Sequence, residues 1–418
     1  MATKENEHVD IDYTFERVPQ TNRKGFWSMF MIMLGFTFFS ASMWTGTTLA
    51  NGLNFNGFMT AVFVGGAILS AYCGCLGYIG AKTGLNFDLL CHRAFGGKGS
   101  YLPSLMIGLT QIGWCGVGLA MFAYPMQEIF FPNGGKLGLW IMIIIIGLCI
   151  MCSAYFGVKG LEIVSWISVP LIAILGTYAM VVSCARGGGI VAVLNKSASA
   201  PITVAAGIAM VIGSFVSGGT STPNFVRFSK LKPAVITTVI AFMIGNSLMF
   251  FFGGVAGAFT GKNDIFYVMA DLGLMIPAIL VLGANIWTTN DNGLYTGALG
   301  FSNIFKIKKR PMVLIAGVIS IITADWLYNN FCNWLTILNA TLPSIGAILM
   351  VDFFRHKDEY MSDDFKETPV KIWSVIGVIG GALAGNLIKF GVGAVNAMVV
   401  AVICYMIGEL ISGHKTNA

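Results

Sequence analysis

The sequence predicts an all-α integral membrane protein with twelve transmembrane helices. Of its 418 residues, 56% are hydrophobic and only 11% are charged, a balance that few water-soluble domains of this size keep in solution. Apolar runs of about 20 residues, the length of a helix that crosses the hydrocarbon layer, recur along the chain. We expect these spans near residues 26–50, 57–80, 101–130, 137–156, 162–184, 201–226, 233–258, 274–300, 311–325, 331–354, 371–388 and 394–412.

The basic residues are distributed unevenly between alternate connections. With the N-terminus inside, 20 of the 25 Lys and Arg residues lie on the inner side of the membrane. Because such residues are retained on the cytoplasmic side, both termini are predicted to be cytoplasmic. The net charge of +6 is therefore a topology signal, and we expect no nucleic-acid partner.

The hydrophilic parts of the chain are short. Residues 1–24 are predicted to be a disordered cytoplasmic tail without a cleavable signal peptide, 25–412 a single transporter domain, and 413–418 a second cytoplasmic tail. The nine cysteines and four histidines show no ligand spacing, so we expect neither disulfides nor a metal site built from them. No nucleophile elbow or phosphate loop is present, so the sequence predicts neither an enzyme nor a bound cofactor.

Two spans are interrupted by small and hydroxyl residues, at 35–42 in the first and 213–220 in the sixth. Irregular backbone at membrane depth is tolerated where it lines a cavity, and paired interruptions indicate an inverted-repeat transporter. The offset of five spans inverts the second half relative to the first. This predicts repeats of about 25–185 and 200–355, followed by two extra helices at about 370–412. Small-residue packing faces are the alternative explanation.

A candidate cation site lies on the eighth span. Asn285, Thr288 and Thr289 share one helix face, because residues three and four apart are neighbours on a helix. Their oxygens suit a hard monovalent cation such as sodium, and the carbonyls of Gly35 and Phe38 at the first interruption complete a cage of five oxygens. The alternative is that the threonines bond to the carbonyls of their own helix.

A candidate substrate site lies on the third span, where Gln111 and Trp114 are one turn apart. An amide beside an indole suits a flat polar heterocycle, since the ring stacks and the amide donates and accepts hydrogen bonds. Packing between helices is the alternative. At about 1.5 Å per residue, this pair, the two interruptions and the eighth-span polar face all lie near the middle of the bilayer.

Asp291 is the remaining candidate inside the membrane, where a charge costs roughly 2.5 to 3.5 kcal/mol on insertion scales. It lies further along the same span as Asn285, on the cytoplasmic side of it. A proton carrier and a structural ion pair are both compatible with this position.

Several stretches are similar to the nucleobase cation symport family, and in particular to its cytosine carriers. They include LGFTFFSASMWTG, TQIGWCGVG, GSFVSGGT and NIWTTNDN, and the similarity extends over nearly the whole chain. The resemblance implies the leucine-transporter-type fold of two inverted five-helix repeats plus two helices. It also implies import of cytosine with sodium across the cell inner membrane by alternating access, with the protein working as a monomer.

The resemblance further implies the residues of the site. Cytosine would lie between Trp114 and Phe215. The polar contacts would come from Gln111, Ser214, Ser217 and Asn285. The sodium ligands would be Gly35, Phe38, Asn285, Thr288 and Thr289. Proton coupling, a related nucleobase, allantoin or hydantoin as cargo, and a passive channel remain as alternatives.

Overall fold

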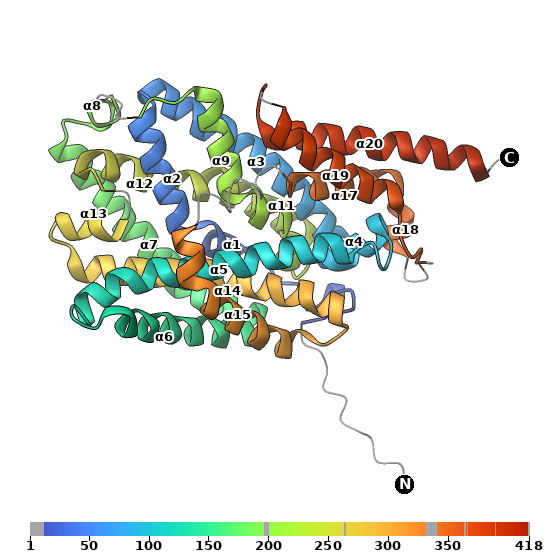
Figure 1. Cartoon of the computed structure of the whole chain (residues 1–418), viewed down its shortest axis with the longest axis horizontal. Coiled ribbons are helices and arrows are strands. Elements are labelled where there is room, and N and C mark those ends of the chain that lie inside the picture. The colour runs from blue at the N-terminus through green and yellow to red at the C-terminus, as the bar shows by residue number, and fades with distance from the viewer. Residues whose placement is uncertain are drawn as a thin grey trace, which may run out of the picture.

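Helices make up nearly the whole of the chain that the structure describes (Figure 1). The computed structural model describes residues 12–195, 200–262, 265–330, 341–362, 365, 367–388 and 390–416. Within these ranges, one isolated parallel bridge joins Lys24 and Ser229. The predicted all-α class is confirmed.

The first half holds a short 3-10 turn and seven α-helices. They are η1 (Gln20–Asn22), α1 (Phe26–Thr37), α2 (Ser40–Gly52), α3 (Phe55–Thr83), α4 (Phe87–Phe95), α5 (Tyr101–Phe130), α6 (Gly135–Tyr155) and α7 (Val158–Arg186). The described second half begins with α8 (Ile190–Leu194), α9 (Val204–Thr220), α10 (Pro223–Val226), α11 (Leu231–Ile240), the π-helical turn η2 (Ala241–Gly245), α12 (Asn246–Thr260), α13 (Ile265–Asp271), α14 (Met275–Phe305) and α15 (Lys309–Asn329). It ends with α17 (Pro343–Arg355), α18 (Lys357–Met361), α19 (Ile372–Leu387) and α20 (Gly393–Thr416).

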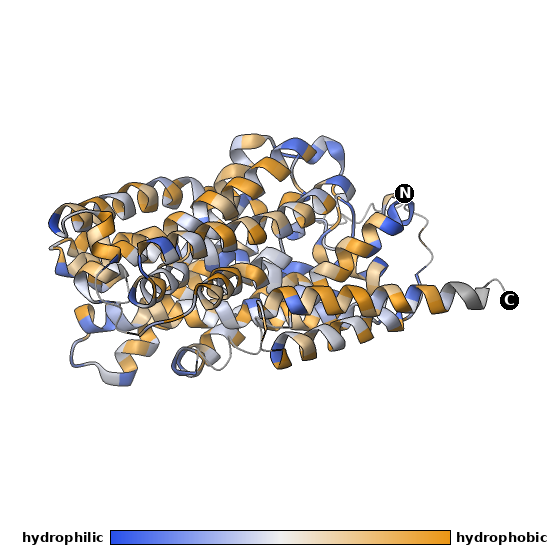
Figure 2. Cartoon of the chain, turned by 90° about the horizontal axis from the view of Figure 1, so that it is seen from above, coloured by the Kyte–Doolittle hydropathy of each residue, from blue (hydrophilic) through white to orange (hydrophobic). Residues whose placement is uncertain are grey.

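Each of the twelve predicted spans contains at least one of these helices, although the start of the tenth, residues 331–340, lies outside the described residues. Among the described helices, seven are long and apolar enough to cross a membrane, or eight when the bent pair α1 and α2 is counted as one span. Hydrophobic residues predominate along the helices, and hydrophilic residues gather mostly at helix ends and connections (Figure 2). The prediction of twelve spans is consistent with this structure.

The first interruption divides the first span into two helices. α1 ends at Thr37 and α2 begins at Ser40, with an angle of 54° between them. Phe39 has an extended backbone, which stops the helical hydrogen-bond ladder. Gly35 lies against α7, because a Cβ atom there would be only 2.4 Å from Ser165 Oγ. The predicted interruption at 35–42 is confirmed.

The second interruption lies later than predicted. α9 is continuous through residues 213–220, where the Ser214 and Thr220 hydroxyls donate to Val211 O and Val216 O of their own helix without interrupting it. The helix ends after Thr220, and α10 begins at Pro223, a residue that has no N–H to continue the ladder. The hydroxyl and glycine run therefore precedes the break rather than forming it.

Tyr72 of α3 supports the end of α9 through a hydrogen bond of 2.7 Å between its hydroxyl and Thr220 Oγ1. We expect Tyr72→Phe to lower the free energy of unfolding by about 0.6 to 1 kcal/mol, the usual value of such a bond within a membrane protein. Unfolding in mixed micelles measures this change. Tyr178→Phe is the matched control, since Tyr178 is half exposed on α7, and an equal loss in both variants would contradict the assignment.

The predicted disordered tail is wrong for residues 12–24, which we call the N-terminal segment. Arg227 is fully buried and donates to Asp12 O (2.6 Å) and Tyr13 O (2.8 Å), while Lys309 Nζ forms an ion pair with Asp12 Oδ2 (2.8 Å). Buried guanidinium groups require acceptors, and the backbone of this segment supplies them. We call the end of the bundle around Arg227 and Lys309 the basic end.

Candidate substrate and cation sites

A small cavity lies where α1 and Phe39, which follows it, meet α5, α9 and α14. Its lining residues are Phe36, Phe39, Gln111, Trp114, Ser214, Phe215, Ser217, Gly218, Thr289, Asn290 and Gly293. Five of the six residues predicted to bind the substrate are in this set, although they come from distant parts of the sequence. The structure therefore brings the third, sixth and eighth predicted spans together around the first interruption.

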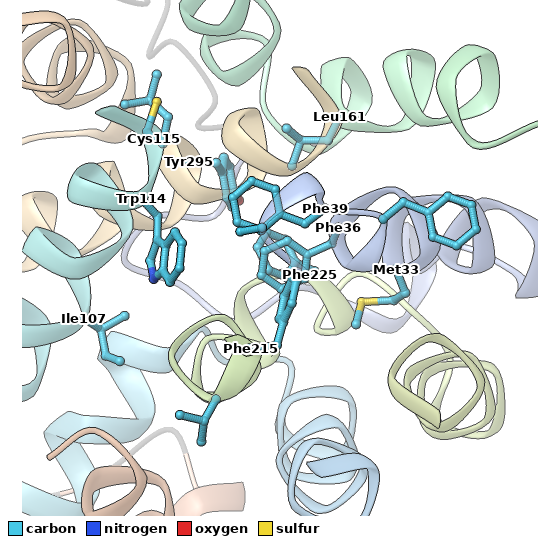
Figure 3. Packing of buried hydrophobic residues seen from close by; sticks show 14 of the residues in the cluster. Met33, Phe36, Phe39, Ile107, Trp114, Cys115, Leu161, Phe215, Phe225 and Tyr295 are labelled. Atoms are coloured by element: carbon cyan, nitrogen blue, oxygen red, sulfur yellow. The ribbon is translucent and has the colours of Figure 1, made fainter. Parts of the chain in front are cut away.

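Four aromatic side chains form the apolar wall of the cavity (Figure 3). Phe39 contacts Trp114 with ring centroids 5.6 Å apart at 76°, and it contacts Phe215 at 6.4 Å and 86°. Phe36 also packs edge-to-face against Phe215, with ring centroids 5.0 Å apart. These edge-to-face pairs hold the rings in place without stacking them flat on one another. Phe39 closes one side of the space between Trp114 and Phe215.

Two buried amides face this cavity with a free donor. Gln111 Nε2 and Asn290 Nδ2 have no hydrogen-bond partner among the described residues, and their side chains are 3% and 1% exposed. An unsatisfied buried donor costs about 1 to 3 kcal/mol, so natural proteins retain few of them. Trp114 Nε1, in contrast, donates to Ser217 Oγ at 3.2 Å. The free amides indicate a ligand with hydrogen-bond acceptors.

Asn285, the sixth predicted substrate residue, is not part of the cavity lining. Its Oδ1 accepts a hydrogen bond from Ser40 N, the first backbone N–H of α2, and its Nδ2 has no partner in the described chain. The side chain of Asn285 thus caps the helix that follows the first interruption. The amide that α14 presents to the cavity is Asn290.

The predicted cation ligands also converge at the first interruption. Thr289 Oγ1 donates to Phe38 O at 3.0 Å and approaches Gly35 O at 3.4 Å. Thr288 packs beside Gly35, where an added Cβ would lie 3.5 Å from Thr288 Cβ. The Thr288 hydroxyl donates to Ala284 O (3.0 Å) within its own helix.

The end of α1 favours a positive charge at this point. The last carbonyls of a helix have no partner within it and carry the negative end of the helix dipole. Here the carbonyls of Gly35 and Phe38 face the Thr289 hydroxyl of α14, so hard oxygen donors come from both sides. That chemistry suits sodium and needs no histidine or cysteine. Among the described residues, no group of three or more His, Cys, Asp or Glu side chains is placed to hold a metal ion.

Sequence reasoning missed five lining residues, namely Phe36, Phe39, Gly218, Asn290 and Gly293. Asn290 follows the predicted threonine pair directly, and Phe39 lies inside the predicted interruption, so the signals were adjacent to residues already chosen. Gly118 of α5 makes room for Asn290, because a Cβ atom there would lie 2.0 Å from its Nδ2.

Comparisons with known proteins agree with this fold. The model of a family described as permeases for cytosine/purines, uracil, thiamine and allantoin matches residues 17–371. The cytosine permease of Escherichia coli (strain K12) is 42% identical over 413 residues, which cover 98% of this chain and 97% of that protein. A hydantoin permease of Microbacterium maritypicum is 20% identical over 363 residues, 78% of this chain and 73% of its own.

Solved structures show the same architecture. Mhp1, a nucleobase-cation-symport-1 family transporter in a closed conformation with bromovinylhydantoin bound, has a TM-score of 0.80 at 17% identity, covering 96% of this chain and 95% of that one. A Na+-coupled sialic acid symporter in an outward-open state has a TM-score of 0.69 at 15% identity, covering 93% and 90%. The predicted leucine-transporter-type fold is confirmed. The chain belongs to the family of permeases for cytosine/purines, uracil, thiamine and allantoin, and is a membrane transporter rather than an enzyme.

Proposed function

We propose that this protein imports cytosine together with sodium across the cell inner membrane, as a monomer with both termini in the cytoplasm. The observation that carries the proposal is the pair of unpartnered buried amides, Gln111 and Asn290, in a cavity walled by Trp114 and Phe215. Thr289 belongs both to this cavity and to the cluster of oxygens at the first interruption. One residue thus touches both proposed ligands.

The hydrogen-bonding groups and the flat ring of cytosine match the donors and aromatic rings that line the cavity. Its carbonyl oxygen and unprotonated ring nitrogen are acceptors, which match the free Nε2 of Gln111 and Nδ2 of Asn290. Its flat ring stacks between Trp114 and Phe215, a contact worth about 1 to 3 kcal/mol per base. Ser214 and Ser217 add polar contacts from α9.

Sodium fits the oxygens at the end of α1. The proposed ligands are the carbonyls of Gly35, Phe38 and Asn285 and the hydroxyls of Thr288 and Thr289. When the ion binds, it takes the place of the hydrogen bond from Thr289 to Phe38 O. The Thr289 hydroxyl keeps its proton and rotates so that a lone pair faces the ion. The ion would then tie α14 to the first interruption more strongly than one hydrogen bond does.

We attribute the coupling of sodium and cytosine binding to Thr289 and Phe39, which both lie at the first interruption, beside both proposed sites. A cation between α1 and α14 fixes the interruption, and with it the Phe39 ring that contacts Trp114 and Phe215. Sodium therefore prepares the stacking space for the base. By linkage, each ligand must tighten the binding of the other by the same factor. Rocking of a helix bundle against the rest of the protein, which acts as a scaffold, would then open the site to the inside.

The relatives support this reading. The protein that is 42% identical over nearly the full length is named a cytosine permease, and a structural neighbour is described as Na+-coupled. The basic end, where the N-terminal segment folds onto the bundle, corresponds to the proposed cytoplasmic side under the positive-inside rule.

Uptake of labelled cytosine into proteoliposomes tests the proposal. We expect labelled cytosine to accumulate inside when sodium is higher outside. Excess unlabelled cytosine should inhibit this uptake more strongly than uracil, adenine or hydantoin does. Accumulation driven by a pH gradient in sodium-free buffer would establish proton coupling instead. Equilibration without accumulation under any gradient would establish a passive facilitator.

Gly118→Ala tests the role assigned to Asn290. The added Cβ would overlap Asn290 Nδ2, so the amide must leave its position, and we expect cytosine affinity to fall by about 5- to 20-fold, the loss of one hydrogen bond to a buried amide. Equilibrium binding of labelled cytosine measures the change. Gly283→Ala is the control, because its Cβ would make only an ordinary contact of 3.4 Å with Phe122. Unchanged affinity in Gly118→Ala would remove Asn290 from the site.

A further inference from the structure

Asp291 is a buried carboxylate that the proposed sodium and cytosine contacts leave unused. It is 0% exposed on α14, and Asn292 Nδ2 donates to its Oδ1 at 3.1 Å. Its Oδ2 lies without a hydrogen-bond donor in the described part of the chain, and no described Lys, Arg or His pairs with it. The structural ion pair that the sequence left open is therefore not found there.

Two more oxygens accompany this carboxylate. Asn292 Oδ1 is also without a partner among the described residues. Ser153 of α6 lies near Asp291; its Oγ donates to Ile150 O at 3.1 Å and accepts a bond from Trp287 Nε1 at 3.0 Å. A carboxylate, an amide oxygen and a hydroxyl are the donor set of a hard cation. Because all three side chains are buried, no bulk water stabilises the charged form of this carboxyl group, and a bound cation would do so instead.

This oxygen group is linked to the proposed sodium site. Asn292 Nδ2 also donates to the backbone oxygen of Thr288 at 2.6 Å, so the two groups are adjacent. Thr288 and Asn292 are four residues apart on α14, about 6 Å along its axis. Tyr295, one turn further, accepts a hydrogen bond from Arg227 of the basic end. The polar face of α14 thus continues from the cation ligands toward the proposed cytoplasmic side.

We propose that Asp291, Asn292 and Ser153 form a second sodium position, which the coupling ion occupies on its way from Thr288 and Thr289 to the basic end. The inference rests on the proposed sodium symport. The carboxylate draws the ion away from the first position once the loaded carrier has changed conformation. The ion in turn supplies the positive charge that no described residue brings to Asp291.

Sodium titration calorimetry on purified variants tests this second position directly. Thr289→Ala disrupts the first position, and we expect it to retain a weaker sodium isotherm. Thr289→Ala combined with Asp291→Asn should lose that isotherm. If the double variant binds sodium as Thr289→Ala does, or if Thr289→Ala binds none, the second position is overturned. If the wild type binds no sodium at all, the proposed symport itself fails.

Transport gives a second readout. Asp291→Asn should slow sodium-driven cytosine uptake by about tenfold or more, while cytosine affinity at saturating sodium, which also shows that the variant is folded, stays within about twofold. Asp291→Glu should recover part of the rate. Asp271→Asn, which removes an exposed carboxylate on α13, is the matched control and should transport normally. A normal uptake rate for Asp291→Asn would overturn the sodium role. So would cytosine uptake that a pH gradient drives in the wild type and that is lost in Asp291→Asn but not in the control.

Discussion

Replacement of Trp114 by alanine is expected to weaken cytosine binding by about 5- to 150-fold, the factor that corresponds to the 1 to 3 kcal/mol of stacking on an aromatic ring. The substitution also removes the edge contact with Phe39 and leaves Ser217 without its indole donor. The affinity loss should therefore fall in the upper part of this range. Equilibrium binding of labelled cytosine to the purified protein in saturating sodium measures it.

Two variants complete that experiment. Trp114→Phe keeps a ring but lacks the N–H that bonds Ser217, so an intermediate affinity is expected. Trp166→Ala removes an exposed tryptophan from α7, away from the cavity, and should leave affinity unchanged. Wild-type affinity in Trp114→Ala would show that the base does not stack on this ring.

The second large effect is expected for Thr289→Ala, which removes a hydroxyl from between α14 and the carbonyls of Phe38 and Gly35. We expect the sodium concentration for half-maximal uptake to rise at least about tenfold, because a ligand of the ion and a lining residue of the cavity are lost together. Uptake measured over a range of sodium concentrations at fixed membrane potential provides the value.

Thr289→Ser retains the hydroxyl and should respond to sodium almost as the wild type does. Thr323→Ala is the control on α15, since its hydroxyl bonds only to carbonyls of its own helix among the described residues. A Thr289→Ala protein with unaltered sodium dependence would place the ion elsewhere.

The helical architecture was predictable because the thickness of the bilayer dictates the length of each apolar run. The first interruption was also predictable, since Phe39 leaves the helix within the expected range. The second was misplaced, because hydroxyls inside α9 are satisfied by carbonyls of their own turn and so do not break the helix. Hydroxyl content alone does not locate a break. Pro223 marked it more closely.

Residues on one helix face were predictable as neighbours, and those that depend on the contact between helices were not. The one-turn spacing of Gln111 and Trp114 put both on the cavity side of α5. For Asn285, no sequence pattern shows that Ser40 N captures its oxygen, so it was expected in the cavity that Asn290 lines instead. Which residues of α14 face the cavity is determined only by the way α1 and α2 pack against this helix.

The N-terminal segment illustrates a different limit. Its polarity is typical of a disordered tail, and no property of the segment itself requires structure. The requirement comes from Arg227, a buried guanidinium far away in the sequence, which binds the backbone carbonyls of Asp12 and Tyr13. The composition of a segment does not show that a residue far away in the sequence will order it.

The central claim is that sodium and cytosine bind next to one another at the first interruption. The most direct test is to measure the dissociation constant of cytosine for the purified wild type in sodium and again in choline at equal ionic strength. A base that binds at least about fivefold more tightly with sodium present, with the reciprocal tightening of sodium by cytosine, is the expected result. Equal affinity in the two salts would mean that the ion and the base do not meet at Thr289, and the coupling proposed for this transporter would be wrong.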